Sequence, residues 1–367
     1  MNKYKPFCIA VLAGVLSTLI LNYFISFEKF SFKKPFLVPN RKTSENKAFD
    51  KNNNSFVILW YSIPRWLDSF AKDFRLLKCK DVRSTCSLST DNSDLNKSNV
   101  VIFSHFTLPK SPPVKHRSQI WIFDTLENKQ FTHWPSSAWK NKFEWMMSYH
   151  RDADVSRPYG KIIELDKGTC IDRNYSAVFR QKTNFGVWMA GYCPTPSQRE
   201  KYIKELQKYV AIDTFGACGK KRCGVYSPRM NECLERFSKE YKFLFSFENS
   251  ICRDYSTEKV FNLYAYNLSI IPVVNGPPQA SEYLPNGTFI NALDFTSPES
   301  LANKLKTIGS DETLYTQYLK EKDKYTSKNI SEIFQETMCT VCKNLKQFGE
   351  QKISINPNLK SVYKGGC

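Results

Sequence analysis

Residues 241–276 read YKFLFSFENSICRDYSTEKVFNLYAYNLSIIPVVNG, and this stretch decides the fold. Its first part, residues 242–247, is apolar and aromatic, which predicts a buried strand. A short polar loop follows, and from Thr257 onward apolar residues recur at helical spacing. Residues 270–274 are apolar again and predict a second strand. The order strand, loop, helix and strand is typical of an α/β sheet.

Polar side chains crowd the first loop of this unit, between the end of a strand and the start of a helix. They are Glu248, Asn249, Asp254, Tyr255, Glu258 and Lys259. In α/β sheets, free backbone N–H groups and the positive end of a helix point toward this position and favour a phosphate-bearing ligand. A solvated surface loop is the alternative interpretation. The crowding between two core strands favours a site for an anionic ligand, without naming that ligand.

The composition limits the classes of protein to which this chain can belong. With 367 residues the chain can hold two domains of ordinary size, and 41% hydrophobic residues suffice for a sizeable core. The formal net charge of +18 is compatible with nucleic-acid binding. However, Lys and Arg are spread along the whole chain and no dense basic run alternates with aromatic residues, so we expect no nucleic-acid partner. Attraction to a nucleotide diphosphate or to an acidic membrane environment explains the charge equally well.

An apolar segment lies near the N-terminus. Residues 6–27 are almost uninterrupted apolar, and about twenty such residues span a bilayer as a helix. A cleaved signal peptide is the alternative, but the run is long for a signal core and no small-x-small cleavage site follows it. We therefore expect a cytoplasmic tail at residues 1–5, a membrane anchor at residues 6–27 and a flexible stem at residues 28–54. The flanking lysines do not decide the orientation.

Two features favour an exported body. Eleven cysteines follow the anchor, which suits an oxidising compartment. Cys79 and Cys86 are close enough in sequence to close a small loop, and Cys339 and Cys342 form a C-x-x-C pair that is either a redox pair or part of a structural disulfide. Six N-glycosylation sequons also occur, at Asn53, Asn96, Asn174, Asn267, Asn286 and Asn329.

The body divides into two expected domains. Residues 55–181 alternate strand and helix patterns, with apolar strands at 55–60, 99–103 and 119–123, which predicts an open α/β domain. Glu127 comes soon after the third strand, in a position suited to catalysis, although a lone Glu there is ordinarily a surface residue.

The second domain is expected at residues 182–345, and residues 346–367 form a C-terminal tail. It begins with an apolar strand near residues 182–190, and residues 199–210 have the pattern of an amphipathic helix. Arg199 lies in the first turn of that helix, where the helix dipole disfavours a cation unless an anion is shared. From the pattern alone, an anion-binding Arg and a solvated Arg are equally good interpretations.

Specific motifs carry a resemblance to a known family. The sequences FENS, DY and TEK, with Asn262 and the closing PVVNG, closely resemble the donor-site motif of the α1,3/4-fucosyltransferases. Residues 143–160, FEWMMSYHRDADVSRPYG, are similar to a second motif of that family. The resemblance covers about residues 100–345. It implies a GT-B-like α/β fold, in which two Rossmann-like domains flank a cleft and bind the acceptor glycan and GDP-fucose respectively.

The resemblance also implies a function and a location. Fucose would pass from GDP-fucose to the 3-hydroxyl of GlcNAc, in an N-glycan core or antenna, with inversion. The protein would be a single-pass type II protein of the Golgi membrane, held by its N-terminal helix with the catalytic body in the lumen. No cofactor is required, and stimulation by Mn²⁺ or Mg²⁺ is left open. Asp152 and Asp154 form a D-x-D pair, which is either a cation site or a polar turn.

Individual roles follow from the same resemblance. Glu127 would deprotonate the acceptor hydroxyl, and Arg199 and Lys259 would neutralise the diphosphate in place of a metal. Cys339 and Cys342 would belong to a terminal structural disulfide. The remaining donor-binding residues would be Glu248, Asn249, Tyr255, Glu258 and Asn262.

Two departures from the family pattern fall in the expected site. Asn128 and Lys129 follow Glu127 where the family often has Ser-Pro, and Ala190 and Gly191 stand where it has Ser and Asn. A glycine there allows the backbone to approach a ligand closely. Two other functions therefore stay open: a membrane-anchored glycan-binding protein without turnover, and a transferase that uses another nucleotide sugar.

Overall fold

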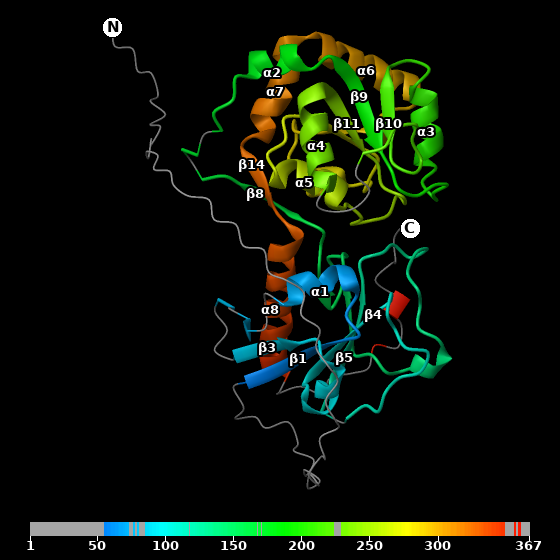
Figure 1. The fold of residues 1–367 in the computed structure, drawn as a ribbon, viewed down its shortest axis with the longest axis vertical. Helices are drawn as coiled ribbons and strands as arrows, with labels where there is room; N and C mark the ends of the chain where they lie inside the picture. The colour runs from blue at the N-terminus through cyan, green and yellow to red at the C-terminus, as the bar shows by residue number, and fades with distance from the viewer. Residues whose placement is uncertain are drawn as a thin grey trace, which may run out of the picture. The chain divides into compact units, whose positions relative to one another are not determined.

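The structure, a computed structural model, describes residues 55–72, 76–77, 79–80, 85–116, 118–166, 168–169, 171–223, 229–348, 356 and 359–360. These residues form two mainly parallel sheets with helices around them, and a third sheet of two strands (Figure 1). The predicted tail, anchor and stem, residues 1–54, lie outside the described residues. Within the described part, no helix is both long enough and apolar enough to cross a membrane.

The first sheet has the strand order β2-β3-β1-β4-β5-β6-β7, and only the edge pair of β2 and β3 is antiparallel. Its strands are β1 (Ser55–Tyr61), β2 (Leu76–Leu77), β3 (Thr85–Ser89), β4 (Val100–Ser104), β5 (Ile120–Thr125), β6 (Trp145–Ser148) and β7 (Val155–Ser156). Its short helices are α1 (Arg65–Lys72), η1 (Asn92–Lys97) and η2 (Ser137–Trp139). Strands β1, β4 and β5 confirm the three predicted strands. Every residue of β4, β5 and β6 is buried, as expected for central strands covered on both faces.

The second sheet has the order β10-β9-β11-β12-β13 and is wholly parallel. Its strands are β9 (Asn184–Met189), β10 (Ile212–Phe215), β11 (Tyr241–Ser246), β12 (Ile271–Val274) and β13 (Ile290–Asn291). The helices are α2 (Tyr175–Gln181), α3 (Arg199–Leu206), α4 (Arg229–Glu240), α5 (Glu258–Ala265), α6 (Pro298–Ser310) and α7 (Glu312–Lys322), with short η3 (Ala280–Glu282) and η4 (Ala292–Asp294). Strand β11, helix α5 and strand β12 confirm the unit predicted from residues 241–276, and Thr257 caps α5.

The chain connects the two sheets twice. Strand β8 (Lys161–Glu164) leaves the first sheet, and strand β14 (Tyr325–Lys328) returns after α7. These two strands pair antiparallel over their whole length, so the outgoing and returning connections support each other. Strand β14 then leads directly into α8 (Ile330–Phe348).

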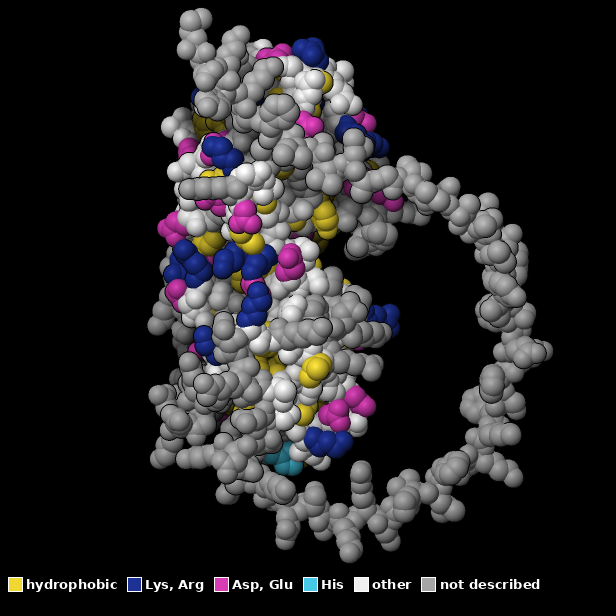
Figure 2. All heavy atoms as spheres, turned by 90° about the vertical axis from the view of Figure 1, so that its left-hand side faces the viewer, with side chains coloured by type: hydrophobic (Ala, Val, Ile, Leu, Met, Phe, Trp, Pro, Cys, Tyr) yellow, Lys and Arg dark blue, Asp and Glu magenta, His cyan; other side chains and the backbone are white. Residues whose placement is uncertain are grey.

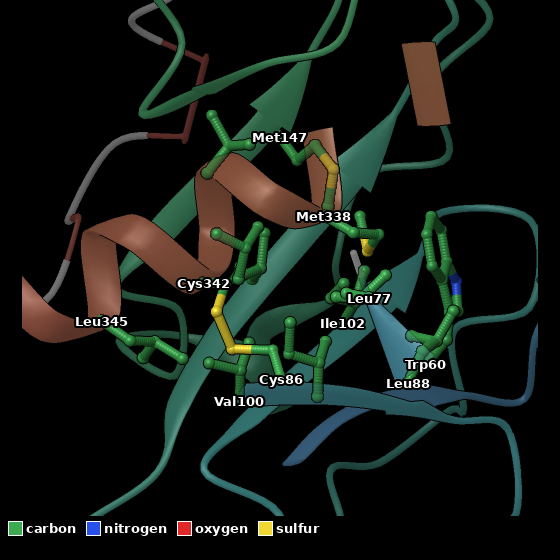
Figure 3. Close-up of a cluster of buried hydrophobic side chains, with 14 of the residues drawn as sticks. Trp60, Leu77, Cys86, Leu88, Val100, Ile102, Met147, Met338, Cys342 and Leu345 are labelled. Atoms are coloured by element: carbon green, nitrogen blue, oxygen red, sulfur yellow. A yellow bond between two sulfur atoms is a disulfide. The ribbon is translucent and has the colours of Figure 1, made fainter. Parts of the chain in front are cut away.

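Helix α8 completes the core of the first sheet rather than of the second. The ring of Phe334 in α8 stacks on Trp60 of β1, with ring centroids 5.6 Å apart. Such a contact contributes about 1 kcal/mol of stability beyond the burial of the two side chains. The range 182–345, expected to form the second domain, therefore ends in a segment whose core contacts are with the first sheet. The α8 side chains in that core cluster are Phe334, Met338, Val341, Cys342 and Leu345 (Figure 3).

Two disulfides join α8 to the first sheet. Cys339 bonds to Cys79 and Cys342 bonds to Cys86, across sequence separations of 260 and 256 residues. The predicted disulfide between Cys79 and Cys86, which would have closed a small loop, is therefore wrong, because each of these cysteines bonds to a cysteine of α8 instead. Cys339 and Cys342 are confirmed as disulfide cysteines, but they are not a redox pair with each other. In the second domain, two shorter bridges join Cys193 to Cys218 and Cys223 to Cys233.

The surface carries its positive charge mixed with negative charge. Figure 2 shows Lys and Arg side chains gathered at mid-height on one face, with Asp and Glu side chains among them. Among the described residues, Lys324 pairs with Glu321 at 2.6 Å, and Lys328 pairs with Glu336. On this face the excess charge is thus interrupted by carboxylates.

The predicted glycosylation positions lie at the surface wherever the structure describes them. Asn96, Asn174, Asn267, Asn286 and Asn329 are all exposed, and Asn53 lies outside the described residues. Asn174 also caps α2, because its side-chain oxygen accepts from the backbone N–H of Ala177 at 3.0 Å. Attachment of glycans at these positions stays a prediction.

Candidate active site

A cavity of about 170 Å³ lies at the carboxyl ends of β9, β10 and β11. In a parallel α/β sheet this is the edge where ligands bind. Strand ends supply Ala190, Gly191 and Gly216 to its lining, and the starts of α3 and α5 supply charged side chains. Of the seven predicted donor residues, the cavity lining includes Arg199, Glu258, Lys259 and Asn262, whereas Glu248, Asn249 and Tyr255 lie beside it in the loop between β11 and α5.

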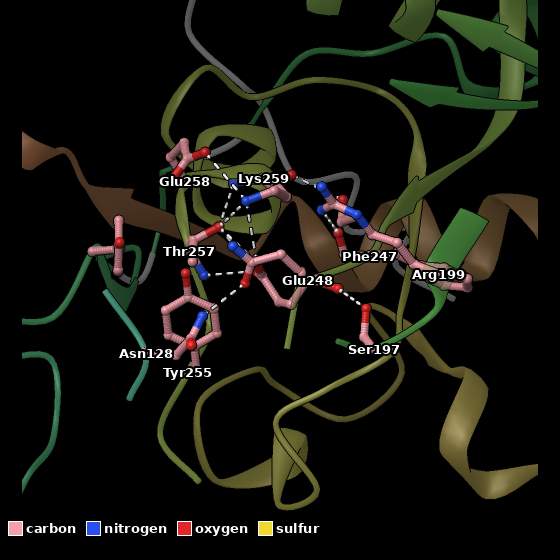
Figure 4. A network of polar contacts seen from close by, with 12 residues as sticks. Asn128, Ser197, Arg199, Phe247, Glu248, Tyr255, Thr257, Glu258 and Lys259 are labelled. Atoms are coloured by element: carbon pink, nitrogen blue, oxygen red, sulfur yellow. Dashed lines mark hydrogen bonds and ion pairs between the residues drawn. The ribbon is translucent and has the colours of Figure 1, made fainter. Parts of the chain in front are cut away.

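Glu248 is buried, and its carboxylate fixes the start of α5. One carboxylate oxygen accepts from the backbone N–H of Thr257 at 2.8 Å, and the Thr257 hydroxyl lies 2.9 and 3.0 Å from the two oxygens (Figure 4). The Nζ of Lys259 donates to Oε2 at 3.1 Å. The backbone of Glu248 is held in turn by Asn275, whose side chain accepts from its N–H at 2.6 Å and donates to its carbonyl at 3.3 Å. Glu248 therefore positions Lys259.

Two of these supporting residues were missed by sequence reasoning as members of the site. Thr257 was recognised only as the start of a helix pattern, and Asn275 only as the end of a strand. A Thr directly before a helix is a common N-cap, and that signal could have identified its hydroxyl as a site donor. Nothing in the sequence indicates that Asn275 contacts Glu248, because the contact depends on β11 and β12 being neighbours.

Lys259 carries a positive charge into the cavity. Its Nζ lies 2.8 Å from the Thr257 hydroxyl, 3.1 Å from Glu248 and 3.4 Å from Glu258. Burial disfavours the charged ammonium, but the carboxylates of Glu248 and Glu258 outweigh it and raise the pKa of Lys259 above its ordinary value. Lys259 is therefore a cation at neutral pH, held at a fixed position.

Arg199 is the second cation of the cavity. It begins α3 and is only 4% exposed. One Nη donates to the carbonyl of Phe247 at 2.7 Å and the other to the carbonyl of Tyr192 at 3.2 Å, while Nε has no hydrogen-bond partner within the described residues. Burial lowers the pKa of Arg199, and nearby carboxylates, Glu248 first, oppose that shift. A guanidinium buried against carbonyl groups favours an anionic ligand in the adjoining cavity.

Glu127 follows β5 and is half-buried. The hydroxyl of Tyr255 donates to its Oε2 at 3.4 Å, so the buried Tyr255 reaches this carboxylate. Burial raises the pKa of Glu127; Lys259 opposes this rise and Glu258 adds to it. A carboxylate with a raised pKa is suited to accept a proton near neutral pH.

Asn128 is a further residue that sequence reasoning missed. It is buried, and its side-chain NH₂ donates to Asn249 Oδ1 at 3.1 Å, joining positions 121 residues apart. Its own Oδ1 accepts from the backbone N–H of Gln130 at 3.0 Å. Asn128 thus ties the loop that carries Glu127 to the loop that follows β11. In the sequence it appeared only as a departure from Ser-Pro, and its position next to Glu127 was the available signal.

Asp254 explains why the segment at residues 143–160 accompanies the donor-site motif. It has a φ of 64° and a buried carboxylate. That carboxylate accepts from the backbone N–H of Arg151 at 3.1 Å, lies 3.3 Å from Nδ1 of His150, and accepts from the hydroxyl of Tyr283. The segment after β6 is therefore bonded to the loop that carries Tyr255.

The D-x-D pair has protein partners on both carboxylates. Asp152 pairs with Arg253 at 2.6 Å, and Asp154 accepts from the backbone N–H of Met146 at 2.7 Å. Across the described ranges, no group of three or more His, Cys, Asp and Glu side chains is arranged to hold a metal ion. Residues 151–154 lie in turns and bends, and binding of a cation at this pair stays a prediction.

Ala190 and Gly191 both line the cavity. Gly216 has a φ of 87°, and a Cβ there would lie 2.4 Å from the carbonyl oxygen of Ala190, so only glycine fits this approach. A Cβ at Gly191 would meet no atom within 4 Å. Packing within the described residues therefore does not require a glycine at position 191, and its absent side chain leaves room in the cavity.

Two family descriptions match successive parts of the sequence. "Fucosyltransferase, N-terminal" matches residues 52–160, and "Glycosyltransferase family 10 (fucosyltransferase) C-term" matches residues 179–362. The chain belongs to glycosyltransferase family 10. The first match contains Glu127 and the second contains the whole cavity lining, so the family predicted from the motifs is confirmed.

The named relatives of this family 10 chain are also fucosyltransferases. The 4-galactosyl-N-acetylglucosaminide 3-alpha-L-fucosyltransferase 9 of Mus musculus is 31% identical over 307 residues, which cover 78% of this chain and 78% of the mouse protein. The glycoprotein 3-alpha-L-fucosyltransferase A of Drosophila melanogaster is 28% identical over 298 residues and 79% of this chain, which spans only 56% of the fly protein. A crystal structure of an α1,3-fucosyltransferase with GDP superposes with a TM-score of 0.53 at 18% identity, over 86% of this chain and 96% of that one. This likeness confirms the predicted GT-B-like α/β fold.

Proposed function

We propose that this family 10 chain transfers L-fucose from GDP-β-L-fucose to the 3-hydroxyl of GlcNAc in a glycan, with inversion to an α1,3 linkage. One observation carries the proposal: a cavity at the strand ends lined by the cations Arg199 and Lys259, with the carboxylate of Glu127 held by Tyr255 from the neighbouring loop. The names of the mouse and fly relatives support the same donor sugar and linkage.

On the donor side, the diphosphate would lie against Arg199 and Lys259. Two fixed cations in a partly dehydrated cavity stabilise the charge that develops on the departing GDP. Glu258, Asn249 and Asn262 would hydrogen-bond the ribose or fucose hydroxyls. Glu248 acts through Lys259, since its carboxylate is occupied by Lys259 and Thr257. Two protein cations at this position make a metal unnecessary in the proposal, and the effect of Mn²⁺ or Mg²⁺ is left to experiment.

On the acceptor side, Glu127 would act as the general base. Its carboxylate would take the proton of the acceptor 3-hydroxyl while that oxygen attacks the anomeric carbon of fucose. The bond from this carbon to the β-phosphate oxygen breaks on the opposite face, and GDP leaves with the electron pair. Attack and departure on opposite faces invert the β-linked donor to an α-linked product.

The proposed setting is the lumen of the Golgi, with residues 6–27 as the anchor of a type II membrane protein. Supporting observations are the apolar run itself, the disulfides of the body and the surface position of the described sequons. Disulfides persist in oxidising compartments such as the lumen, in which the catalytic body would lie.

The test is transfer by the full chain with labelled GDP-fucose and EDTA, using two acceptors: an N-acetyllactosamine glycan and a core chitobiose glycopeptide. Transfer to either supports the proposal, and the preferred acceptor distinguishes antenna from core. GDP-mannose and UDP-galactose serve as matched donors and should give no transfer. Transfer that appears only after Mn²⁺ is added would contradict the metal-free part. Binding of GDP-fucose without transfer to any glycan would contradict the proposal and favour a glycan-binding protein.

A further inference from the structure

The loop between β5 and η2 carries Glu127 and touches the second domain at two points. The NH₂ group of Asn128 donates to Asn249 Oδ1 at 3.1 Å, and the ring of Phe131 lies edge-on to that of Tyr192, with ring centroids 5.7 Å apart. Asn249 comes shortly after β11, and Tyr192 comes shortly after β9. The loop that carries the proposed base is therefore held against two strand-end loops of the second domain.

The side chain of Asn128 is held in one orientation by its own loop. It is buried, and its Oδ1 accepts from the backbone N–H groups of Gln130 and Phe131 at 3.0 and 3.3 Å. An Asn oxygen bound in this way closes a turn, so the NH₂ group faces away from that turn. The backbone carbonyl of Asn128 also accepts from the Thr132 hydroxyl at 2.9 Å. Bonds inside the loop thus set the direction in which the NH₂ group points.

Asn128 contacts a second group of the proposed active site besides Asn249. Its side chain forms a hydrogen bond with that of Tyr255, and the two lie next to each other in Figure 4. Burial raises the pKa of Tyr255, nearby carboxylates add to the rise, and this hydrogen bond opposes it, as expected when the phenol oxygen accepts. The hydroxyl of Tyr255 in turn donates to Oε2 of Glu127 at 3.4 Å. A path of hydrogen bonds therefore leads from Asn128 through Tyr255 to the carboxylate of Glu127.

The two bonds of Asn128 act on different parts of the proposed reaction. A hydrogen bond donated to the phenol oxygen strengthens the bond that the same hydroxyl donates, because successive hydrogen bonds polarise one another. The strengthened bond stabilises the charged form of Glu127. On the donor side, the bond to Oδ1 of Asn249 leaves the NH₂ group of Asn249 to donate to a sugar hydroxyl of GDP-fucose.

We propose that Asn128 is a positioning residue for fucose transfer, which aligns Tyr255 on the base Glu127 and orients Asn249 toward the donor. This proposal rests on the proposed function. One NH₂ group then holds the base and the donor sugar in a fixed relation to each other. The Ser that the family often has at this position lacks the NH₂ group and is shorter, so the arrangement is a property of this chain.

The test uses Asn128→Ser in the full chain, beside Tyr255→Phe and the double variant. The Ser hydroxyl still accepts from the backbone of the turn but cannot replace the NH₂ group. KM for GDP-fucose should rise about 3- to 10-fold, the loss expected for one hydrogen bond. The acidic limb of the kcat–pH profile should move to higher pH, by less than in Tyr255→Phe, because the carboxylate of Glu127 is less stabilised. In the Tyr255→Phe background, Asn128→Ser should not move the limb further, because the path to Glu127 is already broken.

Melting temperatures show whether each variant is folded. Asn128→Thr fills more of the volume, also lacks the NH₂ group and carries the same expectations if Asn128→Ser does not fold. Asn303→Ser, at an exposed position of α6, is the matched control and should behave as wild type.

The outcomes separate this role from the proposed function. An active Asn128→Ser with the pH limb and the KM of the wild type would overturn the positioning role and leave the proposed function standing. A limb that moves equally with and without the Tyr255 hydroxyl would overturn it too, since Asn128 would then act on the structure alone. A wild type that transfers no fucose to any acceptor would contradict the proposed function and the positioning role with it.

Discussion

At the scale of single residues, the environment of Glu127 determines its chemistry. A carboxylate that removes a proton in the transition state contributes about 10²–10⁴ in rate. We therefore expect Glu127→Gln to lower kcat by about that factor while GDP affinity changes little, because Glu127 is not part of the cavity lining. Transfer rates at saturating donor and calorimetric titration with GDP measure the two quantities. A variant that keeps near-wild-type kcat would remove Glu127 from the mechanism.

The pH dependence of kcat follows from the direction in which the pKa of Glu127 is shifted. Burial raises the pKa of Glu127, and a general base acts only when deprotonated, so kcat should fall as pH drops through this raised pKa. The hydrogen bond from Tyr255 stabilises the carboxylate and lowers that pKa. Tyr255→Phe should therefore move the acidic limb of the pH–rate profile to higher pH. A limb that stays in place, or moves to lower pH, contradicts the contact between these two groups.

Lys259 combines a proposed role in binding with a role in stability. Lys259→Ala should lower both turnover and GDP affinity, and it should also lower the melting temperature, because it leaves the buried Glu248 without its cation. The double variant Lys259→Ala with Glu248→Gln removes that buried charge. The double variant should recover much of the melting temperature and none of the activity. Recovery of both would mean that Lys259 acts only through stability.

At the scale of elements, the sequence predicts local units well. Strand β11, helix α5 and strand β12 lie within one residue of the predicted bounds, because apolar spacing and the Thr257 cap are contiguous signals. Helix α8 shows the limit. The expected domain bounds put most of this helix in the second domain, whereas it packs on the first sheet, because that packing follows from the return of the chain along β14, which no local signal contains.

The two disulfides of α8 give an element-scale prediction. Each closes a loop of more than 250 residues, but while one remains, the other closes only the short ring between 79–86 and 339–342. In the chain-entropy model, removing either one costs about 3 kcal/mol of unfolding free energy, and removing both costs clearly more than twice that.

Denaturant unfolding of the Cys79→Ala/Cys339→Ala pair, the Cys86→Ala/Cys342→Ala pair and the fourfold variant measures these costs. The Cys223→Ala/Cys233→Ala pair, whose bridge spans 10 residues, serves as a short-loop control. Strictly additive losses for the two α8 bridges would contradict the loop-closure account.

At the scale of the whole molecule, the candidate site depends on contacts between distant segments. The sequence located most of the chemical groups of the site. The loop after β11 and Glu127, which comes two residues after β5, can both be recognised because each follows the end of a predicted strand. It could not show that Asp254 accepts from Arg151 or that Asn128 donates to Asn249, because these partners are 103 and 121 positions apart. Such pairs become predictable only when the order of strands in both sheets is known.

Global stability should depend on pH through a buried lysine. Lys182 is buried, and its Nζ donates to the carbonyl of Tyr241 at 3.0 Å and to that of Ser238. Burial, followed by nearby cations such as Arg173, lowers the pKa of Lys182 to about 7. Above that pH the folded chain has released a proton that the unfolded chain still holds, so stability from this group rises with pH until the unfolded pKa of about 10.4.

The expected contribution is up to about 1.4 kcal/mol of unfolding free energy per pH unit between pH 7.5 and 9. Lys182→Met should remove it, whatever constant offset the substitution adds, because Met does not titrate. Lys204→Met, at an exposed position of α3, is the control and should leave the slope unchanged. Denaturant unfolding across this pH range compares the slopes. Equal slopes in the wild type and in Lys182→Met would mean that Lys182 stays protonated in the folded chain, because a nearby negative charge compensates for its burial.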